Sequence, residues 1–196
     1  MKKTPKTLID ITFELLYKKG YCATSLIDIL ELAKLTKGAM YYHFKNKNEL
    51  VLASMKCYLD EILISQWVDP LENSEKPKKA IINQINLFYK AFENKDYFLD
   101  IKHGCPLSNF VLDMSDKDEL FFTYLHSVYE RWQISVKEAL IRAIDLKQTN
   151  SNFDADKQAL FIISSIEGII CTAKAHNSLK HLHNGFEVIN DYIESL

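Results

Sequence analysis

Two short helix-forming segments separated by a turn lie within residues 25–50, and this pattern constrains the fold most. Ser25 is a favourable N-cap, and Asp28 stands three residues later, where its carboxylate can bond back to the cap amide. Thr36 is a small hydroxyl residue that can cap the second segment. The intervening turn has the length that a helix-turn-helix needs, with Leu35 as its buried residue. We therefore predict a helix-turn-helix.

The second helix of this motif is expected to begin with a small, basic and hydroxylic tip. Gly38 and Ala39 would let the backbone approach a groove closely, and Lys37 would reach a base or a phosphate. The hydroxyl and phenol groups nearby can donate to phosphate oxygens. We predict that Lys37 contacts a base and that the other residues of this set mostly contact DNA phosphates. The predicted DNA-binding residues are Ser25, Thr36, Lys37, Gly38, Ala39, Tyr41, Tyr42, His43 and Lys47.

These residues also resemble a known family. The resemblance rests on Gly20-Tyr21, Thr24-Ser25-Leu26, Asp28-Ile29, the run from Thr36 to Phe44, Lys47 and Leu50. Over residues 5–52 the chain resembles the tetracycline-repressor (TetR) family, which implies a homodimeric repressor released from DNA by a ligand. One departure is Lys34, where many members carry glycine. If that residue is left-handed, lysine costs about 1 kcal/mol.

The rest of the chain is predicted to be helical as well. Five glycines and four prolines in 196 residues favour long helices, and apolar residues recur at helical spacing without a useful alternating pattern. We predict an all-α protein of about nine helices. Residues 1–47 would form the helix-turn-helix DNA-binding domain with a three-helix head, and residues 48–196 a helical ligand-binding and dimerisation domain.

Several helix boundaries follow from capping residues, prolines and glycines. The first helix should be capped by Thr4 and end near Gly20. Asn46 with Glu49 should cap the helix that follows the motif, and residues 68–79 should form a linker. The remaining predicted starts are near Ala80, at Pro106, after Ser115 or Asp116, after Asp154, and near Asn184.

Charge is distributed unevenly along the chain. Residues 1–47 carry nine lysines and four acidic residues, a net charge of +5, and the remaining residues carry a net charge of −7. A basic head on an acidic body suits a protein that presents one end to double-stranded DNA. The homodimer that the resemblance implies would bind a palindromic operator. Asp10 and Glu14 interrupt any signal-peptide core, and residues 159–171 are too short and too polar for a membrane span. We expect a cytoplasmic protein that has no membrane partner.

Aromatic side chains concentrate between residues 88 and 132, as is typical of pockets for small organic molecules. The resemblance places the inducer cavity in this region. The alternative is that these rings only fill a core. An apolar, uncharged or weakly charged inducer is expected. The predicted ligand-binding residues are Phe88, Phe92, Cys105, Phe110, Tyr124 and Trp132.

Cys105 supports an alternative function. It stands between Gly104 and Pro106, just before a predicted helix, where a thiol can become reactive toward electrophiles or oxidants. A similar stretch occurs in a TetR subgroup that includes regulators of responses to reactive electrophiles. The competing interpretation is a small buried side chain that closes a helix junction. The four cysteines have no CxxC spacing, so reduced thiols are expected.

Other classes of function have little support in the sequence. A di-iron site in a helical bundle usually needs Glu-x-x-His pairs, and the chain has none. It also lacks a Gly-x-Ser-x-Gly motif and a phosphate-binding loop. The histidines at 176, 181 and 183 lack converging partners, so no metal and no cofactor are expected. The alternatives from another class are a small-molecule carrier and a helical-bundle enzyme without DNA function.

The last part of the chain contains small residues at helical spacing, which let two helices approach closely. They are Ser164, Ser165, Gly168, Cys171, Ala173 and Ala175. The resemblance implies a homodimer in which the last two long helices of each subunit form a four-helix bundle. The alternative is a contact within one chain, because monomer cores also use small residues.

Overall fold

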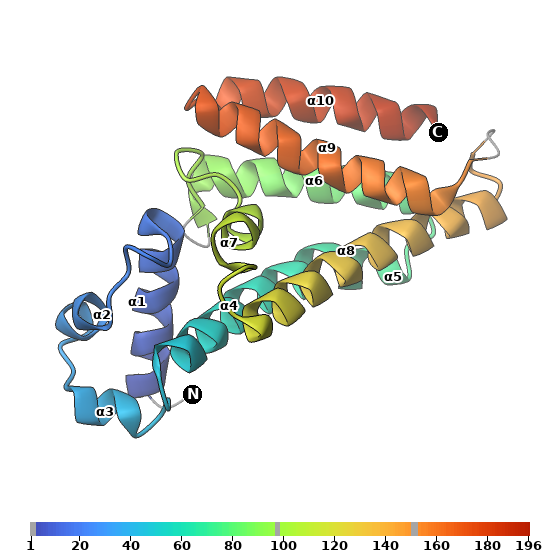
Figure 1. Cartoon of the computed structure of the whole chain (residues 1–196). Helices are drawn as coiled ribbons and strands as arrows, with labels where there is room; N and C mark the ends of the chain where they lie inside the picture. Colours follow the sequence, from blue (N-terminus) through green and yellow to red (C-terminus); the bar gives the residue numbers. More distant parts are fainter. Residues whose placement is uncertain (1–2, 97–98, 150–152) are drawn as a thin grey trace. The chain divides into compact units, whose positions relative to one another are not determined.

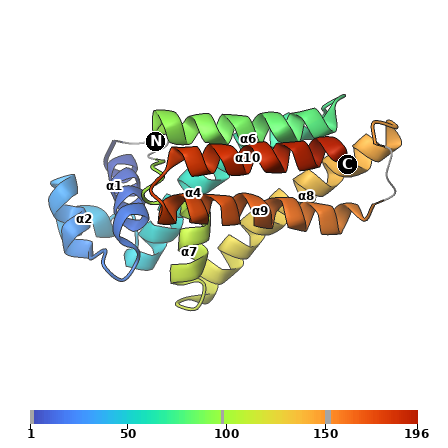
Figure 2. The same ribbon diagram turned by 90° about the horizontal axis from the view of Figure 1, so that it is seen from above.

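The structure is a computed structural model, and it describes residues 3–96, 99–149 and 153–196. Within these ranges the chain is all-α, as predicted, apart from turns and short irregular segments. Figures 1 and 2 show the helices from two directions. The elements are α1 (Lys3–Lys19), α2 (Leu26–Ala33), α3 (Lys37–Tyr41), α4 (Lys47–Leu63), the π-helix η1 (Ile64–Val68), α5 (Asp69–Glu72), α6 (Pro77–Asn94), α7 (Pro106–Met114), α8 (Glu119–Asp145), α9 (Ala155–Ala175) and α10 (Leu179–Ser195).

The chain packs as two compact units. The first comprises Met1–Glu61 and Pro106–Leu125, and the second comprises Ile62–Cys105 and His126–Leu196. These units describe packing, whereas the predicted division after residue 47 concerns function and stays a prediction.

An aromatic cluster lies in the core of the first unit. The Phe13 ring of α1 stacks on Tyr58 of α4, with 4.2 Å between centroids, and meets Phe110 of α7 edge-on at 5.7 Å. The Tyr58 hydroxyl donates to the Asp10 carboxylate at 2.7 Å. Burial, reinforced by this carboxylate, raises the pKa of Tyr58 to about 12. This cluster therefore joins α1, α4 and α7, and α2 of the helix-turn-helix packs against α1.

The second unit contains α6, α9 and α10, which lie side by side (Figures 1 and 2). The predicted interior face of α6 is confirmed, because Ile81, Ile85 and Phe88 are buried. Gly185 allows α10 to approach α9 closely. A Cβ atom at this position would lie only 2.4 Å from a side-chain carbon of Ile169.

Most predicted helix starts are confirmed, including those at Pro106 and after Asp154, whose side chain caps α9. Four boundary predictions are wrong. Helix α1 begins at Lys3, so Thr4 lies inside it. Helix α8 begins after Asp118, whose carboxylate accepts the Leu120 amide at 2.9 Å, and not after Ser115 or Asp116.

The third wrong boundary is the start of the last helix. Helix α10 begins at Leu179, where the Ser178 hydroxyl accepts the His181 amide at 3.3 Å, about five residues before the predicted start. Because Ser178 is an ordinary N-cap residue, this start was visible in the sequence.

The fourth is the predicted linker at 68–79, most of which is helical. Pro77 occupies the first turn of α6, where a missing amide hydrogen breaks no helical bond. Pro70 lies just after the π-helix η1, in a helical run that continues without a gap from α4 through η1 to the end of α5. Only 73–76 separate these two helices. The two prolines in this range predicted a linker, but Pro77 begins α6 and Pro70 lies within the helical run that ends at Glu72.

Helix α9 is long and apolar enough to cross a membrane by length and composition, although we expected no such segment. The shorter range 159–171 was considered in that prediction, whereas the helix spans 21 residues. Core helices of water-soluble proteins pass the same test. Helix α9 packs against α10 in the second unit, so packing accounts for at least part of its apolar surface.

Candidate DNA-binding surface and ligand-binding residues

Local hydrogen bonds build the helix-turn-helix as the sequence predicts. The Ser25 hydroxyl accepts the Asp28 amide at 3.0 Å, and the Asp28 carboxylate accepts the Ser25 amide at 3.2 Å, which completes a capping box. These bonds lower the pKa of Asp28 below its usual value. Lys34 ends α2 in the left-handed region, with φ 54° and ψ 44°. The Thr36 hydroxyl accepts the Ala39 amide at 3.2 Å and starts α3.

The helix after the motif begins with a variant of the predicted cap. The Asn46 side-chain oxygen accepts the Glu49 amide at 2.9 Å, as predicted. The Glu49 carboxylate accepts the amide of Lys45, at 2.6 Å, instead of the amide of Asn46. This pair therefore joins the loop after α3 to the first turn of α4.

Exposure separates the predicted DNA contacts into two groups. Tyr42 is 80% exposed and Tyr41 53% exposed, although rings of this size are usually covered. Ala39, His43 and Lys47 are half-buried, and the remaining predicted contacts are exposed. Helix α3 ends at Tyr41, so His43 lies beyond the predicted helix 36–43. The tip thus presents small, hydroxyl, basic and phenolic groups together on one exposed segment, and their roles toward DNA stay predictions.

Lys47 is less available than the other predicted contacts. Its ammonium donates to the Tyr21 carbonyl at 3.0 Å and lies 4.1 Å from the centre of the Tyr21 ring. Burial lowers the pKa of Lys47, and the neighbouring Cys22 and Asp113 oppose this effect. A phosphate contact by Lys47 would therefore compete with these interactions.

Tyr21 holds the turn between α1 and α2 through all of its polar groups. Its amide donates to the Asp113 carboxylate of α7 at 2.5 Å, and its hydroxyl donates to the Asn48 side-chain oxygen at 2.6 Å. Asn48 in turn donates to Asp118 at 2.8 Å. The Tyr21 ring meets Phe121 edge-on at 5.5 Å. Burial, with smaller effects of Asp118 and Cys22, raises the pKa of Tyr21.

This network is absent from the sequence prediction. Tyr21 and Asp113 are 92 residues apart, and no local pattern indicates that they meet. The only local signal was Gly20, which ends α1 with φ 80°. A Cβ atom there would lie 2.9 Å from an Asp113 carboxylate oxygen, so the glycine also leaves space for this contact.

The six predicted ligand-binding residues are all buried, but they belong to different units. Phe110 and Tyr124 lie in the first unit, and Phe88, Phe92, Cys105 and Trp132 lie in the second. The Tyr124 hydroxyl lies 3.3 Å from both the Met55 carbonyl and the Asp60 carboxylate, either of which can accept its one hydrogen. In the second unit the Trp132 ring lies 5.0 Å from that of Trp67. A ligand-binding role for these side chains stays a prediction.

The surroundings of Cys105 favour packing over reactivity. The thiol is 5% exposed and donates to the Glu167 carboxylate of α9, with 3.2 Å between sulfur and oxygen. A carboxylate at this distance disfavours the negatively charged thiolate, which is the nucleophilic form. The same Glu167 hydrogen-bonds to Tyr129, whose pKa is raised by burial and by this carboxylate. Of the four free cysteines, Cys22 and Cys171 are exposed instead.

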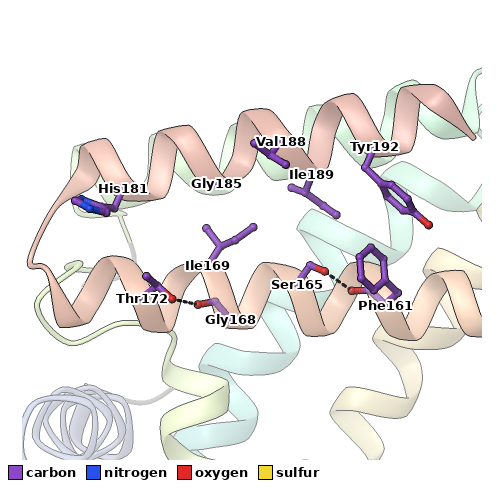
Figure 3. A pocket seen from close by; sticks show the side chains of 10 residues that line it. All are labelled: Phe161, Ser165, Gly168, Ile169, Thr172, His181, Gly185, Val188, Ile189 and Tyr192. Atoms are coloured by element: carbon purple, nitrogen blue, oxygen red, sulfur yellow. Dashed lines mark hydrogen bonds between the residues drawn. The ribbon is translucent and has the colours of Figure 1, made fainter.

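An apolar groove of about 620 Å³ runs between α9 and α10 (Figure 3). Ser165 and Thr172 line it with hydroxyls that are bonded back to their own helix, at Phe161 and Gly168. Nothing lies within 4 Å of a Cβ atom placed on Gly168. None of the six predicted ligand-binding residues lines this groove, whose lining residues are Phe161, Ser165, Gly168, Ile169, Thr172, His181, Gly185, Val188, Ile189 and Tyr192.

The C-terminal histidines do not converge on a site. The rings of His176 and His181 stack with 4.1 Å between their centroids, and the Nδ1 atom of His183 lies 3.3 Å from the Glu187 carboxylate. No group of three or more histidine, cysteine or carboxylate ligands occurs among the described residues.

The fold and the exposed motif define a helix-turn-helix DNA-binding protein with a helical second part. Residues 8–54 match the model for bacterial regulatory proteins of the TetR family, and residues 77–187 match the LmrA/YxaF-like C-terminal domain of transcriptional regulators. The chain therefore belongs to the TetR family of transcriptional regulators, which are not enzymes.

Individual relatives agree with this assignment. An uncharacterized HTH-type transcriptional regulator in the lacX 3' region of Lactococcus lactis is 27% identical over 201 residues, covering 100% of this chain and 96% of its own. The HTH-type transcriptional repressor DhaR of a Mycobacterium species is 24% identical over 194 residues, covering 96% and 92%. A TetR regulator from Chloroflexus aurantiacus shares the fold, with a TM-score of 0.85 and 24% identity over 98% and 94% of the two chains.

Proposed function

We propose that this regulator is a cytoplasmic homodimeric repressor that binds a palindromic operator in double-stranded DNA and is released by a small organic ligand. The observation that carries the proposal is the exposed segment of α3 and the residue that follows it, where Lys37 and Gly38 are exposed and Tyr42 is 80% exposed. Phenols and lysines exposed together suit a phosphate backbone, because both can donate to phosphate oxygens. The relative DhaR is itself described as a repressor.

The groove between α9 and α10 supports a homodimer. Phe161 is 50% exposed and Val188 70% exposed, so the two helices present apolar side chains on the same side as the groove. Continuous apolar surface of this kind marks a protein interface. A second copy of the chain that presents the same surface would cover it through a two-fold axis.

Ligand release is supported by the buried aromatic side chains of the second unit, among them Phe88, Phe92 and Trp132. An apolar or aromatic molecule that replaced part of this packing would favour a different arrangement of the helices. Release requires that the molecule bind the DNA-incompetent form more tightly, and coupling of about 1–3 kcal/mol is typical.

The proposal is tested by selecting operators from random double-stranded DNA with the purified protein. The expected product is a palindrome whose half-sites are spaced by one or more helical turns, each about 34–36 Å. Tyr42→Ala should then weaken binding to every selected sequence by a similar factor, because phosphate contacts carry no base information. Lys37→Ala should change base preference. Selection that enriches no sequence would contradict the proposal.

A further inference from the structure

A second pocket in the structure contains both arginines of the chain. Arg131 and Arg142 are the only arginines in the sequence, and all other strongly basic side chains are lysines. Both line a pocket of about 190 Å³ beside the end of the π-helix, together with Val68, Glu72, Ile134, Ser135 and Glu138. These residues all belong to the second unit. Arginine differs from lysine in presenting a planar fork of donors that matches a carboxylate.

The Arg142 guanidinium has donors left over. One terminal nitrogen donates to the carbonyl of Leu71. Its Nε is buried and has no hydrogen-bond partner, and no carboxylate in the described part of the chain lies within ion-pair distance of Arg142. A partly buried guanidinium without a carboxylate in direct contact is costly. Glu72 and Glu138 line the same pocket but are exposed, so solvent screens their charge, and an anion bound directly to Arg142 would lower that cost.

The bond to Leu71 gives Arg142 a structural role, because it satisfies a carbonyl in the last turn of α5. That role uses one of five donors, and a lysine, the usual basic residue of this chain, would fill it as well. It therefore leaves the other terminal nitrogen of the guanidinium without a partner among the described residues, whereas the Nε is enclosed by protein. The unused donors of the Arg142 guanidinium are the observation that points to a ligand.

The other lining residues restrict the chemistry of that ligand. Ser135 is buried and its hydroxyl donates to the Trp67 carbonyl at 2.7 Å, so it ties α8 to the π-helix and has no hydrogen left for an anion. Val68 and Ile134 supply apolar surface. Glu72 and Glu138 are exposed at the same pocket and would repel an anion of high charge.

We propose that this pocket binds a small monocarboxylate with an apolar body, whose carboxylate lies on the Arg142 fork and whose body lies against Val68 and Ile134. Two parallel hydrogen bonds to a guanidinium make a strong and oriented contact for a single carboxylate. The volume limits the ligand to about the size of one aromatic ring with its acid group. This site is separate from the predicted inducer residues, and it does not depend on DNA binding.

The test uses benzoate and benzylammonium, which have the same ring and opposite charges, and inorganic phosphate as an anion without an apolar body. Calorimetric titration of the full chain should show saturable benzoate binding at one site per chain, and much weaker binding of the other two. Arg142→Gln should weaken benzoate binding about tenfold or more, and Arg142→Lys should recover only part of it because the fork is lost. Lys137→Gln, on the same helix but outside the pocket, should leave binding unchanged.

Glu138→Gln provides a second test of benzoate binding if Arg142→Gln disturbs the fold, which circular dichroism would show. Removing that carboxylate should tighten benzoate binding several-fold, because it removes repulsion at the pocket. Preferential binding of benzylammonium would overturn the proposal. So would benzoate binding that neither Arg142 nor Glu138 affects, or no saturation by benzoate up to millimolar concentrations.

Discussion

Lysines occupy backbone positions where glycine is the usual residue. Lys34, Lys95 and Lys147 all have φ between 53° and 60°, and each follows the end of a helix or turn. A residue with a Cβ atom costs about 1–2 kcal/mol there, because Cβ approaches the carbonyl oxygen. At Lys34 the amide still closes the end of α2 by donating to the Glu31 carbonyl at 3.1 Å. The turn of the helix-turn-helix therefore holds strain that a single substitution can release.

At this scale we expect Lys34→Gly to raise the free energy of unfolding by up to about 1 kcal/mol, since the gain from relieved strain exceeds the extra flexibility of glycine in the unfolded chain. Lys34→Ala is the matched control, because it removes the charge and keeps the Cβ atom. Thermal unfolding at equal protein concentration measures both variants. An equal rise in both midpoints would mean that the charge of Lys34, and not its backbone strain, destabilises the turn.

Residues that act through near neighbours were predictable, and those that act through distant partners were not. Hydrogen bonds join Ser25 to Asp28 and Thr36 to Ala39, and each pair is three residues apart. Local sequence spacing therefore predicts these bonds. Tyr21 depends on Asp113, 92 residues away, and Arg142 depends on Leu71, 71 residues away. Periodicity and capping rules contain no information about such pairs.

Among the elements, the turn between α1 and α2 is held by side-chain hydrogen bonds to residues far away in the sequence. Tyr21 connects it to α4 through Asn48, and Asn48 connects it to Asp118 at the start of α8. Because the three side chains are bonded in series, each depends on the others for its orientation. The caps at Ser25, Thr36 and Asp154 were predicted, whereas the cap at Ser178 was missed and the prolines at 70 and 77 were mistaken for a linker.

We therefore expect Tyr21→Phe and Asn48→Ala to be non-additive. Each single change should lower the free energy of unfolding by about 1 kcal/mol, and the double variant should lose less than the sum by about 0.5 kcal/mol or more. Urea unfolding of the four proteins gives the coupling energy. As a control, Tyr21→Phe combined with Ser165→Ala, a substitution in the other unit, should be additive. Additivity in both pairs would show that the hydroxyl of Tyr21 contributes independently of Asn48.

For the whole molecule, the apolar surface of α9 and α10 was predictable only in part. Small residues at helical spacing in 164–175 indicated a close helix contact, but the sequence did not say with which helix. The structure shows which glycine serves the contact within the chain. The contact within the chain uses Gly185 against Ile169, whereas Gly168 faces open space in the groove. A glycine inside a helix costs about 1 kcal/mol relative to alanine, and no neighbour among the described residues requires it.

The last prediction uses this difference at Gly168. Gly168→Leu adds a side chain where the single chain has room, so we expect no loss of helix content. If a second copy packs on the groove, the same leucine overpacks that interface at a cost of about 1–3 kcal/mol. The dimer should then dissociate at a concentration roughly 5 to 150 times higher, with operator affinity falling in parallel. Gly168→Ala is the matched control, since it improves helix propensity and adds only a methyl group. Sedimentation equilibrium over a concentration series measures all three proteins. A Gly168→Leu protein that remains as dimeric as the wild type would place the dimer interface elsewhere on the chain.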